Sequence, residues 1–298
     1  MAENECGRGG AGRRPLRGNL TVGCGIVHEQ SKKREAAMRL QLRGTFDADA
    51  GAYHCGRPGY PARVYEILSE RCGLGPGCHV LEVGPGTGQA TGELLARGAR
   101  IHAVEFGEQI ARQLRRTFPG KPLSIVEGDF DLVPIQPATY DLAVAATSLH
   151  WLDPCTAVPK IADALKPEGW LAAWWTAFGD PERPTAFRAH VERIHARHLP
   201  EKDRGTGHLP YALRIQDRVA DLRAADRFGP VEVTTLRWEA VFNPAQIRQL
   251  FATFSHLLDL PAHRREMVLD KIAQAAESLG EPVVEPYVTT LFLTRRTI

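Results

Sequence analysis

Residues 80–88 read VLEVGPGTG, a short apolar run that leads directly into three glycines at alternate positions. Glycine is needed where the backbone turns sharply and a ligand must approach without a Cβ in the way. A helix that begins behind such a turn offers free backbone N–H groups to an anionic or polar ligand. The stretch therefore predicts a strand, a ligand-binding turn and a helix.

The spacing of these glycines separates two classes of nucleotide-binding protein. The fingerprint of dinucleotide-binding enzymes is G-x-G-x-x-G, which would need glycine at residue 89 or 91. Those positions hold Gln89 and Thr91, so the pattern is G-x-G-x-G. A nicotinamide oxidoreductase is therefore disfavoured.

Around this stretch, apolar runs alternate with helical patterns. The expected strands are residues 79–83, 100–105, 123–127, 140–146 and 170–176, and the expected helices are 61–72, 89–97, 108–118 and 155–165. Strands that alternate with helices of this length argue for a parallel sheet covered on both faces. The fold class is therefore α/β.

The regular alternation of expected strands and helices ends after residue 178. Residues 180–228 are rich in Arg, His and Glu and read as two or three inserted helices. Further on, 231–242 and 288–294 are strand-like, and 244–258 and 261–279 are helical. A late pair of strands that closes the sheet beside the fifth strand fits this pattern.

The first 38 residues differ from the rest. Seven glycines fall within the first 25 residues, and the segment carries a net charge of +3. Such a sequence cannot bury enough surface to offset the entropy of ordering it, so we expect a disordered extension, with Met38 as an alternative start of translation. RNA binding is the alternative for a basic Gly/Arg segment. Residues 39–298 are expected to form one domain, with a lead-in at 39–60, a core at 60–176, an insertion at 178–228 and a closing part at 229–298.

Composition excludes several classes of function. The chain has 298 residues, a net charge of +2 and 43% hydrophobic residues, as in globular proteins. Because the first 38 residues carry +3, the remainder carries −1 and offers no broad basic surface for nucleic acid. The longest apolar run, 170–178, is too short to span a membrane. Six cysteines without a CxxC motif and no secretory signal favour the cytoplasm. We expect a monomer or homodimer acting on a small molecule.

Acidic residues follow the second and third expected strands. Glu105 stands 21 residues after Gly84, and a carboxylate there can accept hydrogen bonds from both hydroxyls of a ribose. Asp129 and Phe130 follow the third strand, where an acid can accept from an adenine amino group while the ring packs on the base. Ligands of open α/β sheets bind at the carboxyl ends of the strands, where these residues lie.

Five motifs now stand in order: VLEVGPGTG, AVEF, GDF, YDLAVAATSLHW and ALKPEGWLAAWW. Over residues 60–176 they resemble the class I S-adenosylmethionine-dependent methyltransferases. Upstream, Phe46, Tyr53 and the stretch RPGYP (57–61) are similar to the small-molecule branch that includes trans-aconitate methyltransferases. The resemblance implies a Rossmann-like, doubly wound, seven-stranded sheet with a helical insertion or lid. It also implies S-adenosyl-L-methionine as methyl donor, with S-adenosyl-L-homocysteine as product.

The resemblance also implies which residues contact the cofactor. They are Glu82, Gly84, Gly86, Gly88, Glu105, Phe106, Asp129, Phe130, Thr147 and Arg57. Arg57 would pair with the methionyl carboxylate. With Tyr53, a candidate catalytic residue, it would belong to a lid that excludes water.

His150 and Trp151 directly follow the fourth strand, where the substrate pocket of this family opens. His150 is a candidate general base, because the ordinary pKa of histidine lies near neutrality. Alternatively it orients an acceptor oxygen, or it packs on Trp151 for structure alone. Trp151 and Trp175 are the candidate substrate-binding residues.

The sequence therefore predicts methyl transfer to a small-molecule acceptor, with an oxygen of a carboxylate or hydroxyl favoured. N- or C-methylation of a natural product and a binding or regulatory protein with this fold are the alternatives. No metal is expected: His190, His195 and His198 lack a Cys or carboxylate that would complete a ligand set.

Overall fold

The computed structural model describes residues 56–200, 209–224, 226–280 and 282–297, which belong to one compact unit, Leu40–Ile298. The predictions for residues 1–38, for the lead-in up to residue 55 and for Tyr53 lie outside the described residues.

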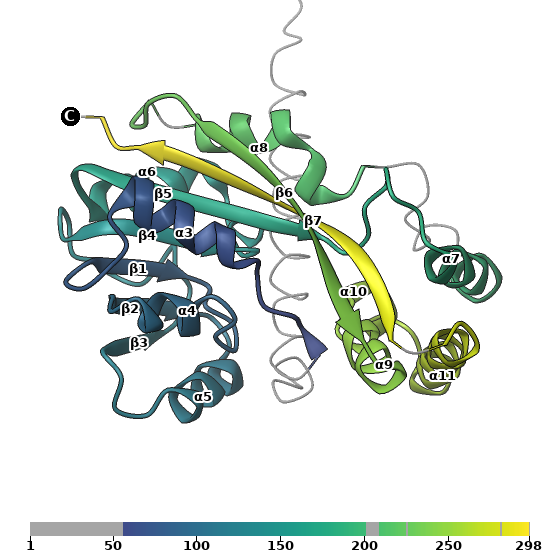
Figure 1. Cartoon of the computed structure of the whole chain (residues 1–298). Helices are drawn as coiled ribbons and strands as arrows, with labels where there is room; N and C mark the ends of the chain where they lie inside the picture. The colour runs from purple at the N-terminus through teal and green to yellow at the C-terminus, as the bar shows by residue number, and fades with distance from the viewer. Residues whose placement is uncertain (1–55, 201–208, 225, 281, 298) are drawn as a thin grey trace, which may run out of the picture. The chain divides into compact units, whose positions relative to one another are not determined.

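A seven-stranded sheet has the strand order β3-β2-β1-β4-β5-β7-β6 (Figure 1). The strands are β1 (His79–Val83), β2 (Arg100–Glu105), β3 (Leu123–Glu127), β4 (Tyr140–Ala146), β5 (Leu165–Ala177), β6 (Glu232–Phe242) and β7 (Val283–Arg295). The first five strands in this order are parallel, and β7 runs antiparallel to both β5 and β6. The predicted α/β fold is confirmed, and β7 and β6 close the sheet beside β5.

Helices precede, connect and follow these strands. They are α3 (Ala62–Cys72), α4 (Thr91–Ala96), α5 (Glu108–Thr117), α6 (Pro154–Ala164), α7 (Ala186–His198), α8 (Ile215–Leu222), α9 (Pro244–Ala252), α10 (Ser255–Leu258) and α11 (Ala262–Ser278), with 3-10 turns η1 (Leu149–Trp151) and η3 (Tyr211–Leu213). In the described part of the chain no helix is long and apolar enough to cross a membrane.

The two faces of the sheet bury separate apolar clusters. Neighbouring residues of a strand point to opposite faces. Thus Trp174 packs in the cluster that holds α3 and α4, and Trp175 packs in the cluster that holds α6 and the end of α8. Strands buried on both faces read as continuous apolar runs, which explains why the pattern predicted these strands so closely.

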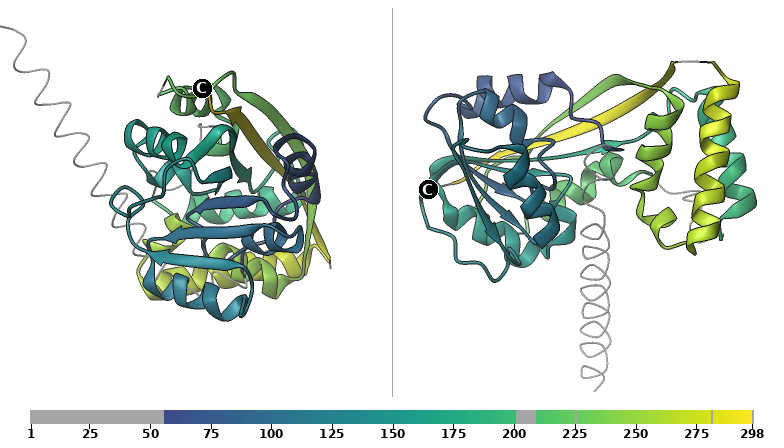
Figure 2. Two further views of the ribbon diagram at one scale, coloured as in Figure 1. Left: turned by 90° about the vertical axis from the view of Figure 1, so that its left-hand side faces the viewer. Right: turned by 90° about the horizontal axis from the view of Figure 1, so that it is seen from below.

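A third apolar cluster lies among α7, α9, α10 and α11 and the adjoining ends of β6 and β7. We call these four helices and two strand ends the helical lobe; Figure 2 shows the helices gathered at one end of the two long strands. Its largest fully buried side chains are Tyr287 and Phe251.

Three boundaries differ from the prediction. The expected helix 244–258 is broken into α9 and α10 at Thr253, whose hydroxyl bonds back to the carbonyl of Leu250 (2.6 Å) and competes with the backbone. β5 begins at Leu165 instead of residue 170, and its first residues form an irregular stretch in which Glu168 has a φ of 66°. β7 begins at Val283 because residues 283–287 pair with the end of β6.

Candidate functional site

A cavity of about 1010 Å³ lies at the carboxyl ends of the parallel strands and extends to the helical lobe. Gly84, Glu105 and Thr147 line it from β1, β2 and β4. Phe178 and Phe254 line it from the loop after β5 and from the lobe. The edge of the sheet where the motifs converge is therefore hollow, as expected for an open α/β fold.

The glycine turn uses its glycines for two purposes. Gly84 and Gly86 line the cavity, with φ values of 65° and 59° that favour glycine. Gly88 is not part of the lining. A Cβ at Gly88 would lie 2.5 Å from Cε2 of Phe118, so this glycine permits close packing against the end of α5.

Glu105 connects the glycine turn to the end of β2. One carboxylate oxygen accepts a hydrogen bond from Gly86 N, and the other accepts one from Gly107 N, both at 3.0 Å. The side chain is buried, yet it lines the cavity together with the adjacent Phe106. Two backbone N–H groups therefore fix the position of a charged acceptor at the rim of the cavity.

Glu82 lies behind the turn, outside the lining of the cavity. It is fully buried, and its Oε2 accepts a hydrogen bond from Thr91 Oγ1 at the start of α4 (2.8 Å). Burial raises the pKa of Glu82 to about 8, and the charge of Glu105 adds to the shift. Glu82 therefore ties β1 to α4, and its contact with the cofactor stays a prediction.

Of the three residues that directly follow β3, two line the cavity and one does not. Phe130 is 2% exposed and lines the cavity, as does Gly128. Asp129 is not in the lining, and its carboxylate accepts a hydrogen bond from Asp131 N (3.1 Å). Phe130 thus forms an aromatic wall at this strand end, and the contact of Asp129 with the cofactor stays a prediction.

Thr147 and Tyr60 meet at the end of β4. Thr147 has a φ of 55°, unusual for a residue other than glycine, and its N donates to Trp174 O (2.7 Å). Its hydroxyl oxygen accepts a hydrogen bond from Tyr60 OH (3.0 Å). Tyr60 also lines the cavity, although sequence reasoning did not single it out.

Arg57 joins the segment before α3 to the helical lobe. Its Nη2 donates to the carbonyl of Thr253 (3.1 Å). Its guanidinium lies over the rings of Phe178 and Phe254, at 4.7 and 5.0 Å from their centroids. A cation on two aromatic faces thus lines the cavity at the entrance to the lobe.

Four aromatic side chains form a cluster beyond the end of β4. Trp175 Nε1 donates a hydrogen bond to His150 Nδ1 (3.0 Å). The His150 ring contacts the rings of Trp151 and Tyr211, at centroid distances of 4.5 and 5.1 Å. All four side chains line the cavity. Tyr211 was missed from sequence, because no local signal shows that η3 folds back onto β5.

The lobe contributes a buried ion pair. Glu285 of β7 is fully buried and accepts hydrogen bonds from Thr185 Oγ1 (2.6 Å) and Arg188 Nε (2.5 Å). Arg188 and His195 of α7 line the cavity. Burial lowers the pKa of His195 to about 4, and the charges of His256 and Arg188 add to the shift. His195 is therefore neutral near pH 7.

Within residues 56–200, 209–224, 226–280 and 282–297, no group of three His, Cys, Asp or Glu side chains is placed to hold a metal ion. His190 instead bonds through Nδ1 to the carbonyl of Ala186, within its own helix (2.9 Å).

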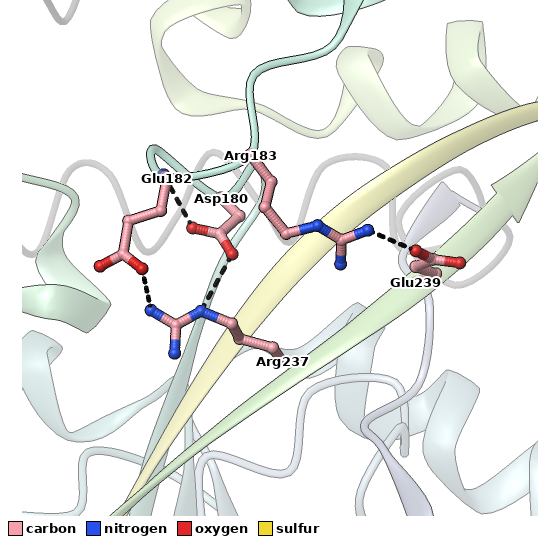
Figure 3. A network of polar contacts seen from close by, with 5 residues as sticks. All are labelled: Asp180, Glu182, Arg183, Arg237 and Glu239. Carbon is pink, nitrogen blue, oxygen red and sulfur yellow. Dashed lines mark hydrogen bonds and ion pairs between the residues drawn. The ribbon is translucent and has the colours of Figure 1, made fainter.

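A polar network fastens the loop between β5 and α7 to β6. Figure 3 shows Arg237 between the carboxylates of Asp180 (3.1 Å) and Glu182 (2.6 Å), and Arg183 beside Glu239 (2.7 Å). The Asp180 side chain is 1% exposed, whereas Arg183 and Glu239 are each 51% exposed. The buried part of this network fixes the loop that forms one wall of the cavity.

The chain is similar in sequence to proteins that are named as methyltransferases. Residues 81–173 match a family model described as a methyltransferase domain. An uncharacterized methyltransferase of Mycobacterium bovis is 28% identical over 256 residues, which cover 84% of this chain and 95% of that protein. An uncharacterized methyltransferase-like protein of Schizosaccharomyces pombe is 25% identical over 80% of this chain and 89% of its own length.

Solved structures share the fold. A protein from Anaeromyxobacter dehalogenans, assigned as a type II methyltransferase, is 27% identical with a TM-score of 0.53, over 81% of this chain and 97% of that one. Phosphoethanolamine N-methyltransferase 2 of Haemonchus contortus, in complex with S-adenosylhomocysteine, has a TM-score of 0.52 at 13% identity, over 86% of this chain and 60% of that one. The matched domain and the relatives indicate a methyltransferase, its sheet has the fold of solved class I methyltransferases, and S-adenosylmethionine is its methyl donor.

Proposed function

We propose that the protein transfers the methyl group of S-adenosylmethionine to an oxygen of a small-molecule acceptor, a carboxylate or a hydroxyl. The observation that carries the proposal is one continuous cavity with two differently built ends. One end is the glycine turn with Glu105, and the other is an aromatic wall with Arg57 and Arg188. A volume of about 1010 Å³ is at the upper end of the range for ligand pockets, which suits a cofactor and an acceptor together.

The first end suits the cofactor. Gly84 and Gly86 let the turn approach a ligand, and the fixed carboxylate of Glu105 suits ribose hydroxyls because each of its oxygens can accept more than one hydrogen bond. Phe130 and Phe106 supply apolar walls for a base. Bound there, the cofactor supplies an electrophilic methyl group, and the protein's task is alignment and exclusion of water.

The second end suits an acceptor with anionic character. Arg57 and Arg188 both line it, among the rings of Phe178, Phe251 and Phe254. Guanidinium groups pair well with carboxylates, and aromatic walls cover the apolar part of a small molecule. The similarity of RPGYP (57–61) to the trans-aconitate branch also supports an acceptor with anionic character.

The test of cofactor binding is calorimetry with S-adenosylhomocysteine on Glu105→Gln. The amide has lost the charge, and only one of its two atoms accepts, so we expect binding weaker by about 5-fold to 30-fold. Glu127→Gln is the matched control. Glu127 pairs with Glu105 in the register of β2 and β3 but is not part of the cavity lining. Equal affinity in the two variants would remove Glu105 from the cofactor site.

The test of transfer is turnover with methyl-labelled S-adenosylmethionine and a panel of small carboxylic acids, alcohols, phenols and amines. Label in an ester or ether is the expected result. Tight binding of S-adenosylhomocysteine without transfer to any class of acceptor would favour a binding protein instead.

A further inference from the structure

The bond between Trp175 and His150 decides where the imidazole carries its proton. An indole nitrogen can only donate, so the Nδ1 that receives its hydrogen bond at 3.0 Å must hold a lone pair. A neutral imidazole has one proton, which is then on Nε2. A doubly protonated ring would bring two N–H groups together and lose the bond.

The surroundings hold both rings in place. Trp175 is 3% exposed, and its ring contacts those of Tyr211 and Phe292 at 5.6 and 5.8 Å. The guanidinium of Arg218 lies 3.6 Å from the centroid of the Tyr211 ring and covers this stack. The indole N–H is therefore directed by packing from two sides, since neighbouring rings limit its rotation.

We propose that Trp175 is a positioning residue that keeps His150 in the Nε2–H tautomer, so that His150 serves the acceptor as a hydrogen-bond donor and the acceptor is a carboxylate. This inference rests on the proposed methyl transfer. A carboxylate oxygen that attacks the methyl carbon forms a C–O bond while the C–S bond breaks and its electron pair passes to sulfur. The products are a methyl ester and a neutral thioether, and no proton is released.

A hydroxyl acceptor would impose a different demand. It must lose a proton during the transfer, and the base needs a nitrogen lone pair. The Nδ1 lone pair of His150 is engaged by Trp175 and Nε2 carries a proton, so this arrangement supplies no proton acceptor at His150. A carboxylate is already ionised at neutral pH and gains from a donated N–H.

The tautomer can be measured directly. We would label the full chain with ¹⁵N-histidine, add S-adenosylhomocysteine and assign the His150 signals by their loss in His150→Asn. Cross-peaks between ring protons and ring nitrogens show which nitrogen carries the proton. We expect the Nε2–H form in the native protein, and a mixture of both tautomers in Trp175→Phe, which keeps an aromatic ring but lacks the N–H.

Trp174→Phe is the matched control. Trp174 is the adjacent residue of β5, fully buried on the opposite face against Tyr60 and Tyr65, so its loss should leave the tautomer of His150 unchanged. A native His150 protonated on Nδ1 would overturn the proposal, and so would a Trp175→Phe spectrum equal to that of the native protein. If Trp175→Phe does not fold, the native spectrum alone still decides.

Kinetics test the acceptor class. With methyl-labelled cofactor, carboxylic acids should be methylated and matched alcohols and phenols should not. Trp175→Phe should lower kcat/KM by about 2-fold to 10-fold, the effect of one hydrogen bond. His150→Asn, which keeps an N–H donor, should stay within about 10-fold of native kcat. Turnover of phenols or alcohols that falls more than about 100-fold in His150→Asn would overturn this proposal while leaving methyl transfer in place. A native protein that does not bind S-adenosylhomocysteine would overturn both.

Discussion

Two strands of the sheet each contain a fully buried glutamate, and the protein accommodates the two in opposite ways. Glu82 in β1 receives one hydroxyl hydrogen bond from Thr91, and burial raises its pKa to about 8. Glu285 in β7 is paired with Arg188 and also bonded by Thr185. One side chain is neutralised by a proton and the other by a guanidinium.

The difference reflects where the two strands lie. β1 is the centre of the parallel half, where α4 offers Glu82 a hydroxyl. The buried end of β7 faces α7, which comes from the inserted segment, so an ion pair there joins two distant parts of the chain. The net contribution of such a buried pair to stability can be small, whereas removing one partner is costly.

The largest expected effect is that of Glu285→Ala. It leaves the partly buried guanidinium of Arg188 without its counter-charge and removes the acceptor for Thr185. Breaking one side of a buried pair costs about 3–5 kcal/mol of unfolding free energy. Urea unfolding, followed by far-UV circular dichroism, measures it. Glu285→Gln keeps an acceptor oxygen, so its unfolding free energy should fall by less. A loss below about 1 kcal/mol of unfolding free energy in Glu285→Ala would show that apolar packing alone holds the lobe.

Glu82→Gln should do the opposite and stabilise the protein, in a way that depends on pH. The folded state keeps the Glu82 proton up to about pH 8, whereas the unfolded chain loses it near the ordinary value of 4.5. Folding therefore takes up a proton between these values, and the stability of the native protein falls as pH rises through the window. The amide does not titrate and can still accept from Thr91. Melting temperatures of the two proteins should agree near pH 4.5 and separate progressively up to pH 8. A constant difference would contradict the raised pKa.

A smaller effect is expected in the network that fastens the cavity loop to β6. Arg237→Ala leaves the buried carboxylate of Asp180 without its cation, at a cost of about 1–3 kcal/mol. Arg183→Ala removes an exposed ion pair with Glu239 and should cost less than about 1 kcal/mol. Both variants remove one arginine that forms an ion pair between the loop and β6, so they are matched. Equal losses would show that burial of Asp180 does not matter to the loop.

The sequence predicted the parallel half to the residue in several places, because each strand there is a short apolar run bounded by turn signals. The limits of β2 and β4 agree with the prediction. The prediction was wrong at the start of β7, because Glu285 and Pro286 interrupt the run of apolar residues there. Residues 283–287 of β7 pair with β6 but not with β5. Pro286, which has no N–H to donate, is therefore tolerated in this part of the strand.

The site was predictable where a motif places a residue at a strand end. Gly84, Gly86, Glu105, Phe130 and His150 all line the cavity. Cavity-lining residues that depend on tertiary packing were not predicted. Tyr211 and Arg188 reach the cavity from the inserted segment, and nothing local distinguishes them from the other tyrosines and arginines of the chain. The burial of Glu82 and the packing of Gly88 on Phe118 likewise depend on neighbours that the motif does not contain.

The position of β7 has a consequence for how the chain is made. It is the last of the seven strands to leave the ribosome, yet it lies between β5 and β6 and contributes side chains to all three apolar clusters. The parallel half can pair during synthesis, because its five strands appear in the first 177 residues. β6 has no partner until β7 emerges, and the helical lobe cannot close around Tyr287 before then. The wall of the cavity that the lobe supplies is thus the last part of the site to form.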